Sequence, residues 1–150
     1  MQLNIFGEKI EGITYQKRLG VYAVIFNFKK DRVAAVKTTN GHYFLPGGGI
    51  EKDEKFEECL RREVLEEIGY EISIRTYIGN AMMHFISTKN EPILSNSYFF
   101  TAQLGEKILE PIEEDHFFEW ITMEEIEKRL VHDHHIWGVK EGLKIYNVED

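Results

Sequence analysis

The sequence predicts an α/β fold with a mixed β-sheet that is covered by helices on both faces. One helical segment, residues 54–68, stands between two groups of strand-like segments, and two further helical segments follow at residues 122–132 and from residue 133. Strands before and after a helix, with helices at the end, are typical of a layered α/β architecture. The chain has 150 residues, 43% of them hydrophobic, so we expect residues 1–150 to form a single domain.

The predicted strands are short segments rich in β-branched and aromatic residues. Residues 21–28 form a nearly unbroken apolar run, which predicts a central strand covered on both faces. Asn40 and Gly41 predict a tight hairpin turn between two further strands. The predicted strands are residues 13–16, 21–28, 32–38, 43–45, 70–78 with a continuation over 81–87, 96–103 and 117–121.

The helix predicted over residues 54–68 contains no Gly or Pro and has an apolar residue at every fourth position. Gly69 follows the last of these, at a position where a left-handed residue commonly ends a helix. We expect the apolar stripe, and Cys59 beside it, to be buried. The stripe consists of Phe56, Leu60, Val64 and Ile68.

The last turns of this helix carry Glu63, Glu66 and Glu67, although the partial negative charge of a helix end favours Lys or Arg there. Their spacing places the three carboxylates on one side of the helix, where they can converge. Their repulsion could be relieved by cationic side chains, by protonation or by a hard divalent cation, which prefers oxygen ligands. In an isolated helix such a pattern is more often a solvated acidic face, but the flanking residues favour the cation.

The flanking residues complete a longer motif. Residues 48–70 resemble the Nudix box, G-x5-E-x7-R-E-U-x-E-E-x-G-U, in which U is a bulky aliphatic residue. Only Tyr70 departs from the pattern, and this change affects packing after the helix without removing a ligand. Fixed residue types at fixed spacings make the signal far more specific than a glycine-rich loop alone. The matching residues are Gly48, Glu54, Arg62, Glu63, Val64, Glu66, Glu67 and Gly69.

The resemblance implies a Nudix-type α/β/α sandwich with a mixed β-sheet and a metal-dependent hydrolase. Members of this family use Mg2+ or Mn2+ to hydrolyse the diphosphate bridge of a nucleoside diphosphate linked to another moiety, by attack of water on phosphorus. It also implies that Arg62 orients or neutralises a glutamate, and that Glu54 receives Arg62 or supports the outer shell of the metal. The metal ligands that it implies are Glu63, Glu66, Glu67 and the carbonyl of Gly48.

The glycine run that precedes the helix is a candidate substrate-binding loop. Pro46 stops the preceding strand, and Gly47, Gly48 and Gly49 follow it. Glycines permit backbone conformations that side chains forbid and let a ligand approach the main chain closely. Without the helix that follows, the run would be equally consistent with a flexible turn.

The resemblance leaves the general base open, because some members use a helix glutamate and others use an acid from a later loop. We expect Glu67 to act as base ahead of Glu113 and Glu114, which lie in an acidic loop, and Glu66 to be a further catalytic candidate. Asp115 is a weaker candidate of the same kind. The alternative for the loop acids is that they are solvated turn residues.

Composition limits the partners of the chain. A formal charge of -8 disfavours duplex nucleic acid, which requires clustered Lys and Arg, but allows a small phosphate substrate bridged by metal ions. The single cysteine permits no internal disulfide and no zinc cluster, as is usual in a reducing cytoplasm. Residues 1–12 contain no apolar stretch flanked by basic residues. We therefore expect a cytoplasmic protein without a membrane partner, either a monomer or a homodimer.

Three alternatives stay open at the level of sequence. The chain could be a Nudix-fold module that binds or senses a nucleotide without cleaving it, although such a module would not need all three helix glutamates. His132, His134 and His135 could bind zinc, but they are better explained as part of the turn between two helices. The substrate could be a nucleoside triphosphate, a dinucleoside polyphosphate or a nucleotide sugar. Candidate residues for a base pocket, although side chains of this kind at strand spacing are more often core, are Tyr77, Met82, Phe85 and Tyr98.

Overall fold

The computed structural model describes residues 4–112 and 114–149, and its strands form two sheets. The larger sheet has the strand order β1-β6-β7-β2-β5, and the smaller sheet has the order β4-β3-β8. In the larger sheet, β1 pairs with β6 and β2 with β7 in parallel, whereas the β6–β7 and β2–β5 pairs are antiparallel. The strands are β1 (Ile5–Phe6), β2 (Gln16–Val24), β3 (Arg32–Thr38), β4 (Tyr43–Phe44), β5 (Gly47–Gly49), β6 (Tyr70–Ile86), β7 (Pro92–Lys107) and β8 (His116–Thr122).

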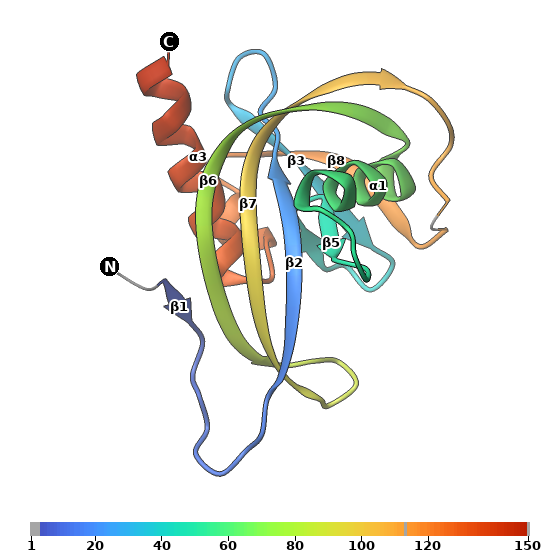
Figure 1. The fold of residues 1–150 in the computed structure, drawn as a ribbon. Coiled ribbons are helices and arrows are strands. Elements are labelled where there is room, and N and C mark those ends of the chain that lie inside the picture. The colour runs from blue at the N-terminus through green and yellow to red at the C-terminus, as the bar shows by residue number, and fades with distance from the viewer. Residues whose placement is uncertain (1–3, 113, 150) are drawn as a thin grey trace.

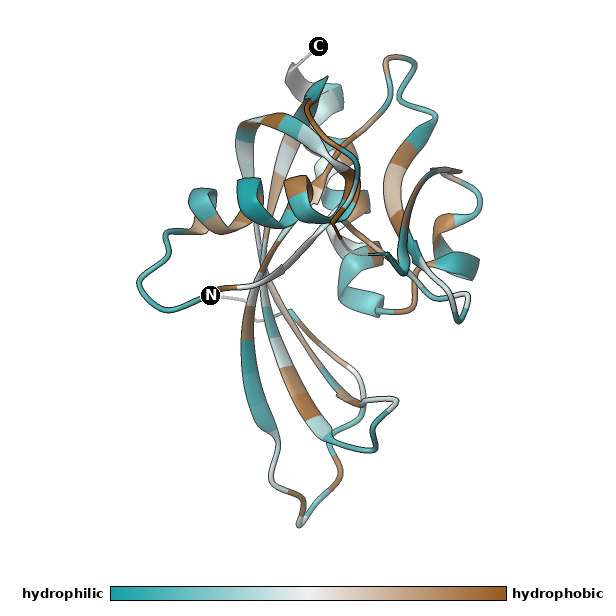
Figure 2. Ribbon diagram, turned by 90° about the vertical axis from the view of Figure 1, so that its right-hand side faces the viewer, coloured by the Kyte–Doolittle hydropathy of each residue, from teal (hydrophilic) through white to brown (hydrophobic). Residues whose placement is uncertain are grey.

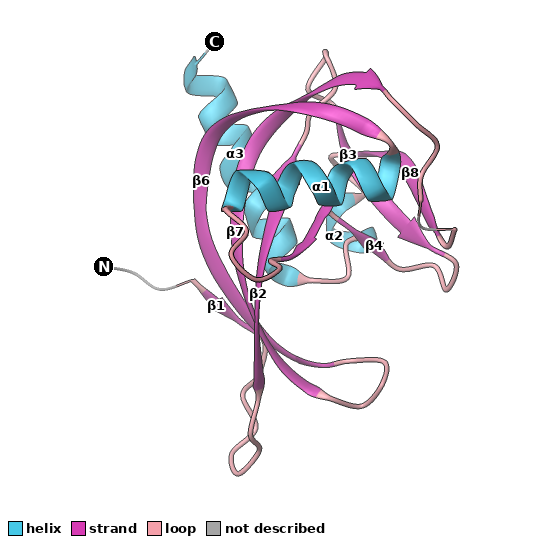
Figure 3. Ribbon diagram, turned by 45° about the vertical axis from the view of Figure 1, so that its right-hand side comes forward, coloured by secondary structure: helices cyan, strands magenta, loops and turns pink. Residues whose placement is uncertain are grey.

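The two long helices lie on opposite sides of the larger sheet (Figures 1 and 3). Helix α1 (Phe56–Ile68) crosses one side, α3 (Asp133–Glu149) packs on the other, and the short α2 (Ile126–Arg129) precedes α3 in the chain. The predicted α/β sandwich with a mixed sheet is therefore confirmed. One detail was not predicted: β3, β4 and β8 pair with one another in a separate antiparallel sheet.

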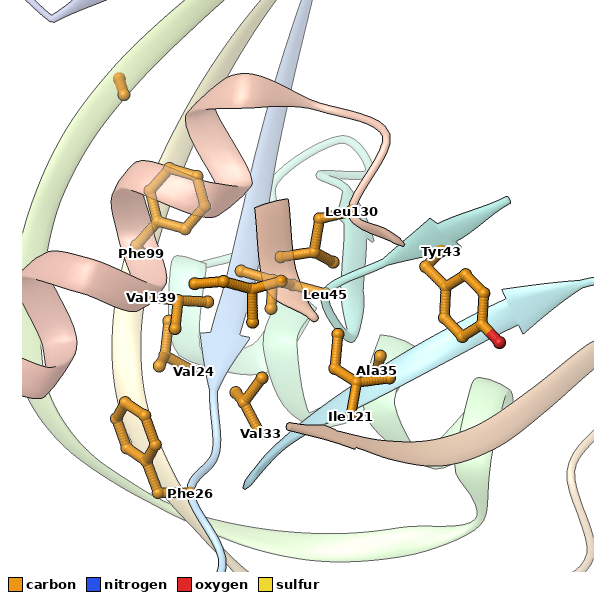
Figure 4. Packing of buried hydrophobic residues seen from close by; sticks show 12 residues of the cluster. Val24, Phe26, Val33, Ala35, Tyr43, Leu45, Phe99, Ile121, Leu130 and Val139 are labelled. Atoms are coloured by element: carbon orange, nitrogen blue, oxygen red, sulfur yellow. The ribbon is translucent and has the colours of Figure 1, made fainter. Parts of the chain in front are cut away.

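Strand β2 explains how both sides of the sheet become buried. Val21 and Ala23 pack into a cluster that contains the apolar stripe of α1, whereas Val24 packs into a second cluster with Val139 of α3. Successive side chains of a strand point to opposite faces, so one apolar run serves both clusters. The prediction of a central strand covered on both faces is confirmed for residues 21–24. The strand begins earlier than predicted, at Gln16, and ends at Val24, and Phe28 is fully exposed. Figure 4 shows the second cluster, which gathers residues from β2, β3, β7, β8 and α3 around Leu45.

Helix α1 is defined by local signals at both ends. Before its first turn, the N–H of Lys55 donates to the Glu58 carboxylate at 3.2 Å. At its end, Gly69 has a φ of 79° and donates its N–H to the carbonyl of Leu65 at 2.9 Å. Leu60, Val64 and Ile68 of the apolar stripe are buried as predicted, with Cys59 buried beside them, whereas Phe56 in the first turn is only partly buried.

Helix α2 is much shorter than the helix predicted over residues 122–132. The N–H and Oγ of Thr122 donate to Oε1 of Glu125 at 3.0 and 2.9 Å, so the expected pairing is present, but it closes a turn and the helix covers only Ile126–Arg129. The chain leaves the helix because the N–H of Val131 bonds to the carbonyl of Tyr43 in β4. A tertiary contact thus overrides the helical pattern.

Polar and apolar residues alternate along several strands, whereas the loops are mainly polar (Figure 2). This alternation agrees with burial of one strand face at a time.

Over the described residues, 4–112 and 114–149, none of the helices combines the length and the apolar character that crossing a membrane requires.

Candidate functional site

The three glycines form the short strand β5, which corrects the expectation of a loop. Gly47, Gly48 and Gly49 pair with three residues of β2, so the run is held in an ordered ladder. A Cβ atom on Gly48 would lie 2.5 Å from Cδ of Glu63, and one on Gly47 would lie 2.2 Å from the carbonyl oxygen of Val21. A side chain is therefore excluded at Gly47, which has a φ of 145° and meets backbone, whereas at Gly48 it would displace the carboxylate of Glu63. Strand β5 thus presents bare backbone to the acidic side of α1.

Glu67 joins the last turn of α1 to β5. Its Oε1 accepts the N–H of Gly47 at 2.8 Å, and the residue is only 7% exposed. A hydrogen bond to a charged acceptor is stronger than a neutral one, so this contact fixes the position of the carboxylate. Tyr22 of β2 lies close by: burial raises the pKa of its phenol, and the charges of Glu67 and Glu63 raise this pKa further.

Arg62 links the other acids of the site to one another. Its Nε and Nη2 donate to the two oxygens of Glu54 at 2.6 and 3.0 Å, a bidentate geometry that arginine favours. Its Nη1 lies 3.0 Å from Oε1 of Glu63 and 3.3 Å from Oε2 of Glu66. Its Nη2 also donates to the carbonyl of Gly49 at 3.1 Å. One guanidinium thus connects the start of α1, its last turns and β5.

The same contacts determine the charge of Glu54. Hydrogen bonds from Arg62 lower the pKa of Glu54 to about 2, and a hydrogen bond from the backbone of Glu51 acts in the same direction. In return, the hydrogen bond to Glu54 raises the pKa of Arg62 above its usual value, although burial opposes this shift. Both partners therefore stay ionised near neutral pH.

Cys59 packs directly beneath the glycine strand. Its Sγ lies 3.5 Å from the carbonyl oxygen of Gly49 and 3.7 Å from that of Gly48. Burial raises the pKa of the Cys59 thiol to about 12, so it remains a neutral, weak donor. This agrees with the packing role expected from its place in the helix.

A cavity of about 300 Å³ opens beside β5. Its wall includes Gly49 of the glycine strand and Tyr22 of β2, so it adjoins the acidic site directly. Volumes of this order are usual for small-molecule sites. A larger cleft of about 860 Å³, bordered by Trp120 and Tyr146, includes no residue of β5 or α1 and is therefore not assigned to this site. The smaller cavity is lined by Arg18, Leu19, Gly20, Tyr22, Phe44, Gly49, Phe85, Ile93, Ser95 and His132.

The oxygens of this site fit a hard divalent cation by their chemistry. Carboxylates on α1 approach a backbone carbonyl strand, and hard cations such as Mg2+ prefer carboxylate and carbonyl ligands. In the observed side-chain conformations, however, Arg62 bridges Glu63 and Glu66. Accordingly, no three His, Cys, Asp or Glu side chains within residues 4–112 and 114–149 are arranged to hold a metal ion. A bound ion would require Glu63 and Glu66 to turn from the guanidinium toward it.

The acidic loop contributes less than expected among the described residues. Glu113 lies outside the residues that the structure describes. Glu114 is exposed and lines a different cavity of about 420 Å³, together with Ile68 and Lys107, and Asp115 is exposed as well. The loop nevertheless meets the end of α1, because the N–H of Ile112 donates to the carbonyl of residue 66 at 2.9 Å.

The three histidines form one cluster, in which His134 and His135 are fully buried and His132 is partly buried. His132 lies between α2 and α3, as expected for an interhelix turn, whereas His134 and His135 belong to the first turn of α3. Their ring centroids are 4.8–5.5 Å apart, and His134 and His135 have no exposed surface. Burial lowers the pKa of His132 to about 4 and that of His134 to about 3, so the rings are neutral at pH 7. Nε2 of His134 lies 3.1 Å from Oγ of Ser95 and 3.2 Å from Oγ of Ser97.

Several residues near the site were not singled out from the sequence. Tyr22 and Phe44 line the cavity, as does His132, which the sequence suggested only as a possible zinc ligand. Of the four candidates for a base pocket, only Phe85 lines it. Tyr98 instead packs against Phe56 of α1, with ring centroids 4.5 Å apart. The missing information was register, because pairing of β2 with β5 brings Tyr22 beside the glycines. No signal within the strand itself distinguishes this tyrosine from a core residue.

Comparisons with known proteins agree with the motif. A NUDIX domain family model matches residues 16–139. Among curated proteins, the low-salt glycan biosynthesis protein Agl8 of Haloferax volcanii is 32% identical over 80 residues, which make up 53% of this chain and 47% of that protein. The chain therefore spans about half the length of the curated relative that it matches.

Solved structures of similar proteins show the same fold. A NUDIX hydrolase from Nitrosomonas europaea has a TM-score of 0.71 and 19% identity, covering 86% of this chain and 90% of that one. An ADP-ribose pyrophosphatase from Streptococcus suis has a TM-score of 0.64 and 17% identity, covering 86% of this chain and 91% of that one. The family model covers well over half of the chain and includes both β5 and α1. The chain therefore belongs to the NUDIX domain family.

Proposed function

We propose that this protein is a metal-dependent hydrolase that cleaves the diphosphate bridge of a nucleoside diphosphate linked to another moiety. Membership of the NUDIX domain family supports a pyrophosphohydrolase in general terms. The observation that carries the proposal is the approach of the α1 carboxylates to the bare backbone of β5, next to a cavity of about 300 Å³. A phosphate chain could lie along the glycines while its organic part enters the cavity.

The ligands that we propose for Mg2+ or Mn2+ are Glu63, Glu66, Glu67 and the carbonyl of Gly48. Their chemistry supports this choice, because all four supply hard oxygen donors from neighbouring elements. When bound, such an ion neutralises charge on the phosphate oxygens and acts as a Lewis acid in phosphoryl transfer. Arg62 would then keep Glu54 as its partner and reduce the repulsion among the remaining acids.

We also propose that Glu67 accepts the proton of the attacking water, with Glu66 as the second catalytic carboxylate. The N–H of Gly47 holds Oε1 of Glu67 in place, so the carboxylate needs little reorganisation before the reaction. Glu66 is the more open of the two, with 32% of its side chain exposed. Glu114 ranks behind both because it lines a different cavity, and Glu113 remains a candidate outside the described residues.

The cavity favours a substrate with one flat ring system. Tyr22, Phe44 and Phe85 offer aromatic surfaces, Ser95 and His132 offer polar atoms, and Arg18 provides a positive charge for a phosphate. These features support a nucleoside as the organic part. The names of two similar proteins, an ADP-ribose pyrophosphatase and a glycan biosynthesis protein, support testing nucleotide sugars first.

The direct test is a series of diphosphate compounds incubated with Mg2+ or Mn2+. The series should contain ADP-ribose, a UDP-sugar, a nucleoside triphosphate and a dinucleoside polyphosphate, with products separated by anion-exchange chromatography. We expect at least one compound to be cleaved, and EDTA to stop the cleavage. Failure on every compound, while Mg2+ still raises the melting temperature, would favour a nucleotide-sensing module instead.

We expect Arg62→Lys to lower kcat by about ten- to a hundredfold, as is usual when a group that orients metal ligands is lost. Lysine keeps the charge but cannot make the bidentate contact to Glu54 while also donating to the carbonyl of Gly49. The matched control is Arg61→Lys, because Arg61 is 54% exposed and pairs with Glu57 at 3.9 Å. The steady-state rate of Arg62→Lys should be clearly lower than that of Arg61→Lys. Equal rates in the two variants would contradict a role for the guanidinium geometry of Arg62.

A further inference from the structure

The segment that leads into β5 is held by a different element at each of three consecutive residues. The N–H of Leu45 donates to Nδ1 of His135 in α3 at 3.1 Å. The carbonyl of Pro46 accepts a backbone N–H from β2 at 2.8 Å. The N–H of Gly47 donates to Glu67 in α1 at 2.8 Å. The path into the glycine strand is thus fixed at three points, and the first of them is a side chain outside the proposed catalytic set.

The contact between Leu45 and His135 lies deep in the core. Both residues have no exposed surface. The side chain of Leu45 belongs to the cluster that contains Val139 of α3 (Figure 4). Water cannot replace the imidazole without opening this core, so loss of the acceptor would leave the N–H of Leu45 buried and unsatisfied.

Packing alone does not explain an imidazole at position 135. Its ring centroid lies 4.4 Å from that of Tyr22 and 5.9 Å from that of Phe99, contacts that a phenylalanine ring could also make. Nε2 of His135 is buried with no hydrogen-bond partner among the described residues, which makes the imidazole costlier to bury than an apolar ring. What only the imidazole supplies is the acceptor for Leu45.

We propose that His135 is a positioning residue for β5, which fixes the entry of the glycine strand through the N–H of Leu45. Its ring also lies against Tyr22, which pairs with Gly47 in the β2–β5 register and lines the cavity beside the site. Burial lowers the pKa of His135 well below its usual value, so Nδ1 keeps its lone pair. The expected effect of His135 on turnover rests on the proposed hydrolase function, whereas its effect on the structure of β5 does not.

Two substitutions at position 135 separate hydrogen bonding from packing. His135→Phe keeps an aromatic ring against Tyr22 and removes the acceptor. His135→Asn places an amide oxygen near the position of Nδ1 and removes much of the ring. His134→Phe is the matched control, because His134 is equally buried in the same helix but contacts Ser95 and Ser97 rather than Leu45.

The first measurement is amide hydrogen exchange of the full chain, read on peptides that cover residues 43–50 and compared with the global unfolding rate of each variant. We expect exchange in this segment to be at least about tenfold faster in His135→Phe, and close to that of the parent in His135→Asn and His134→Phe. Native-like exchange in His135→Phe, or equal exchange in the Phe and Asn variants at position 135, would overturn the proposal.

The second measurement is turnover of whichever diphosphate compound the parent cleaves. We expect His135→Phe to lower kcat by about tenfold with a much smaller change in KM, and His135→Asn to recover most of the loss. If the protein cleaves none of the compounds, the proposed function is wrong. The positioning role of His135 is still tested in that case, because the exchange experiment needs no substrate.

A third measurement uses the unmodified chain and does not depend on whether the variants fold. The ¹⁵N spectrum of the imidazole should show His135 with its proton on Nε2 and an unprotonated Nδ1 near neutral pH. A tautomer with the proton on Nδ1 could not accept the N–H of Leu45, and its observation would refute the proposal.

Discussion

Replacing Glu67 by Gln is expected to lower kcat at least about a hundredfold while the fold stays intact, because a charged oxygen ligand and proton acceptor is lost from a metal-dependent step. The amide oxygen of Gln can still accept the N–H of Gly47, so the contact between α1 and β5 should survive. Glu66→Gln is expected to act similarly. Steady-state rates with Mg2+, together with melting temperatures, test both variants.

The matched control for these variants is Glu57→Gln, in the first turn of the same helix. The side chain of Glu57 is 63% exposed and its ion pair with Arg61 measures 3.9 Å, so its loss should change kcat by less than about twofold. Near-normal rates in both Glu66→Gln and Glu67→Gln would remove the basis for the ligand assignment. A large loss of melting temperature would instead show that the carboxylates act mainly through the β5 contact.

Much of the fold could be predicted because its signals are local. The four-residue period of α1 and the left-handed cap at Gly69 are readable within twenty residues of chain, and both are present in the structure. The uninterrupted apolar run of β2 likewise predicts burial on both faces. The division of the strands into two sheets was not predictable in this way, because it depends on pairing between β3 and β8, which are far apart in sequence.

The functional site was less predictable from the sequence than the fold, for the same reason. The motif identifies which carboxylates and which arginine stand near the glycines, because their spacing on one helix determines where they point. It does not reveal that Arg62 spans from Glu54 to Gly49, or that Tyr22 lies over Gly47. These contacts join elements whose relative position follows from sheet register and helix docking, which no local pattern encodes.

We expect the histidine cluster to lower the free energy of unfolding as the pH falls, beginning at pH values above those at which carboxylates titrate. Burial lowers the pKa of His132 to about 4, with Asp133 opposing the shift, whereas in the unfolded chain the value is near 6.5. As the pH falls below 6.5, His132 therefore becomes protonated in the unfolded chain while it stays neutral in the native protein. The free energy of unfolding falls until His132 is protonated in both states, near pH 4. Glu54 and Glu125, whose pKa values are lowered to about 2, lose their stabilising contribution only below about pH 4.5.

The magnitude makes this effect measurable. From pH 7 to pH 5, a histidine with a folded pKa of about 4 costs about 2 kcal/mol of unfolding free energy. His134, with a folded pKa of about 3, costs a similar amount, and burial of His135 acts in the same direction. His132 and His134 together therefore cost about 4 kcal/mol, a large part of the stability of many domains. Urea unfolding followed by circular dichroism at pH 7, 6 and 5 should show this loss, and His132→Gln should recover about 2 kcal/mol of it. Phe85→Leu, which perturbs packing 4.5 Å from the same ring without removing a titratable group, should lower stability equally at each pH. If His132→Gln leaves the pH dependence unchanged, His132 takes up its proton in the folded core nearly as easily as in the unfolded chain, and burial does not control its pKa.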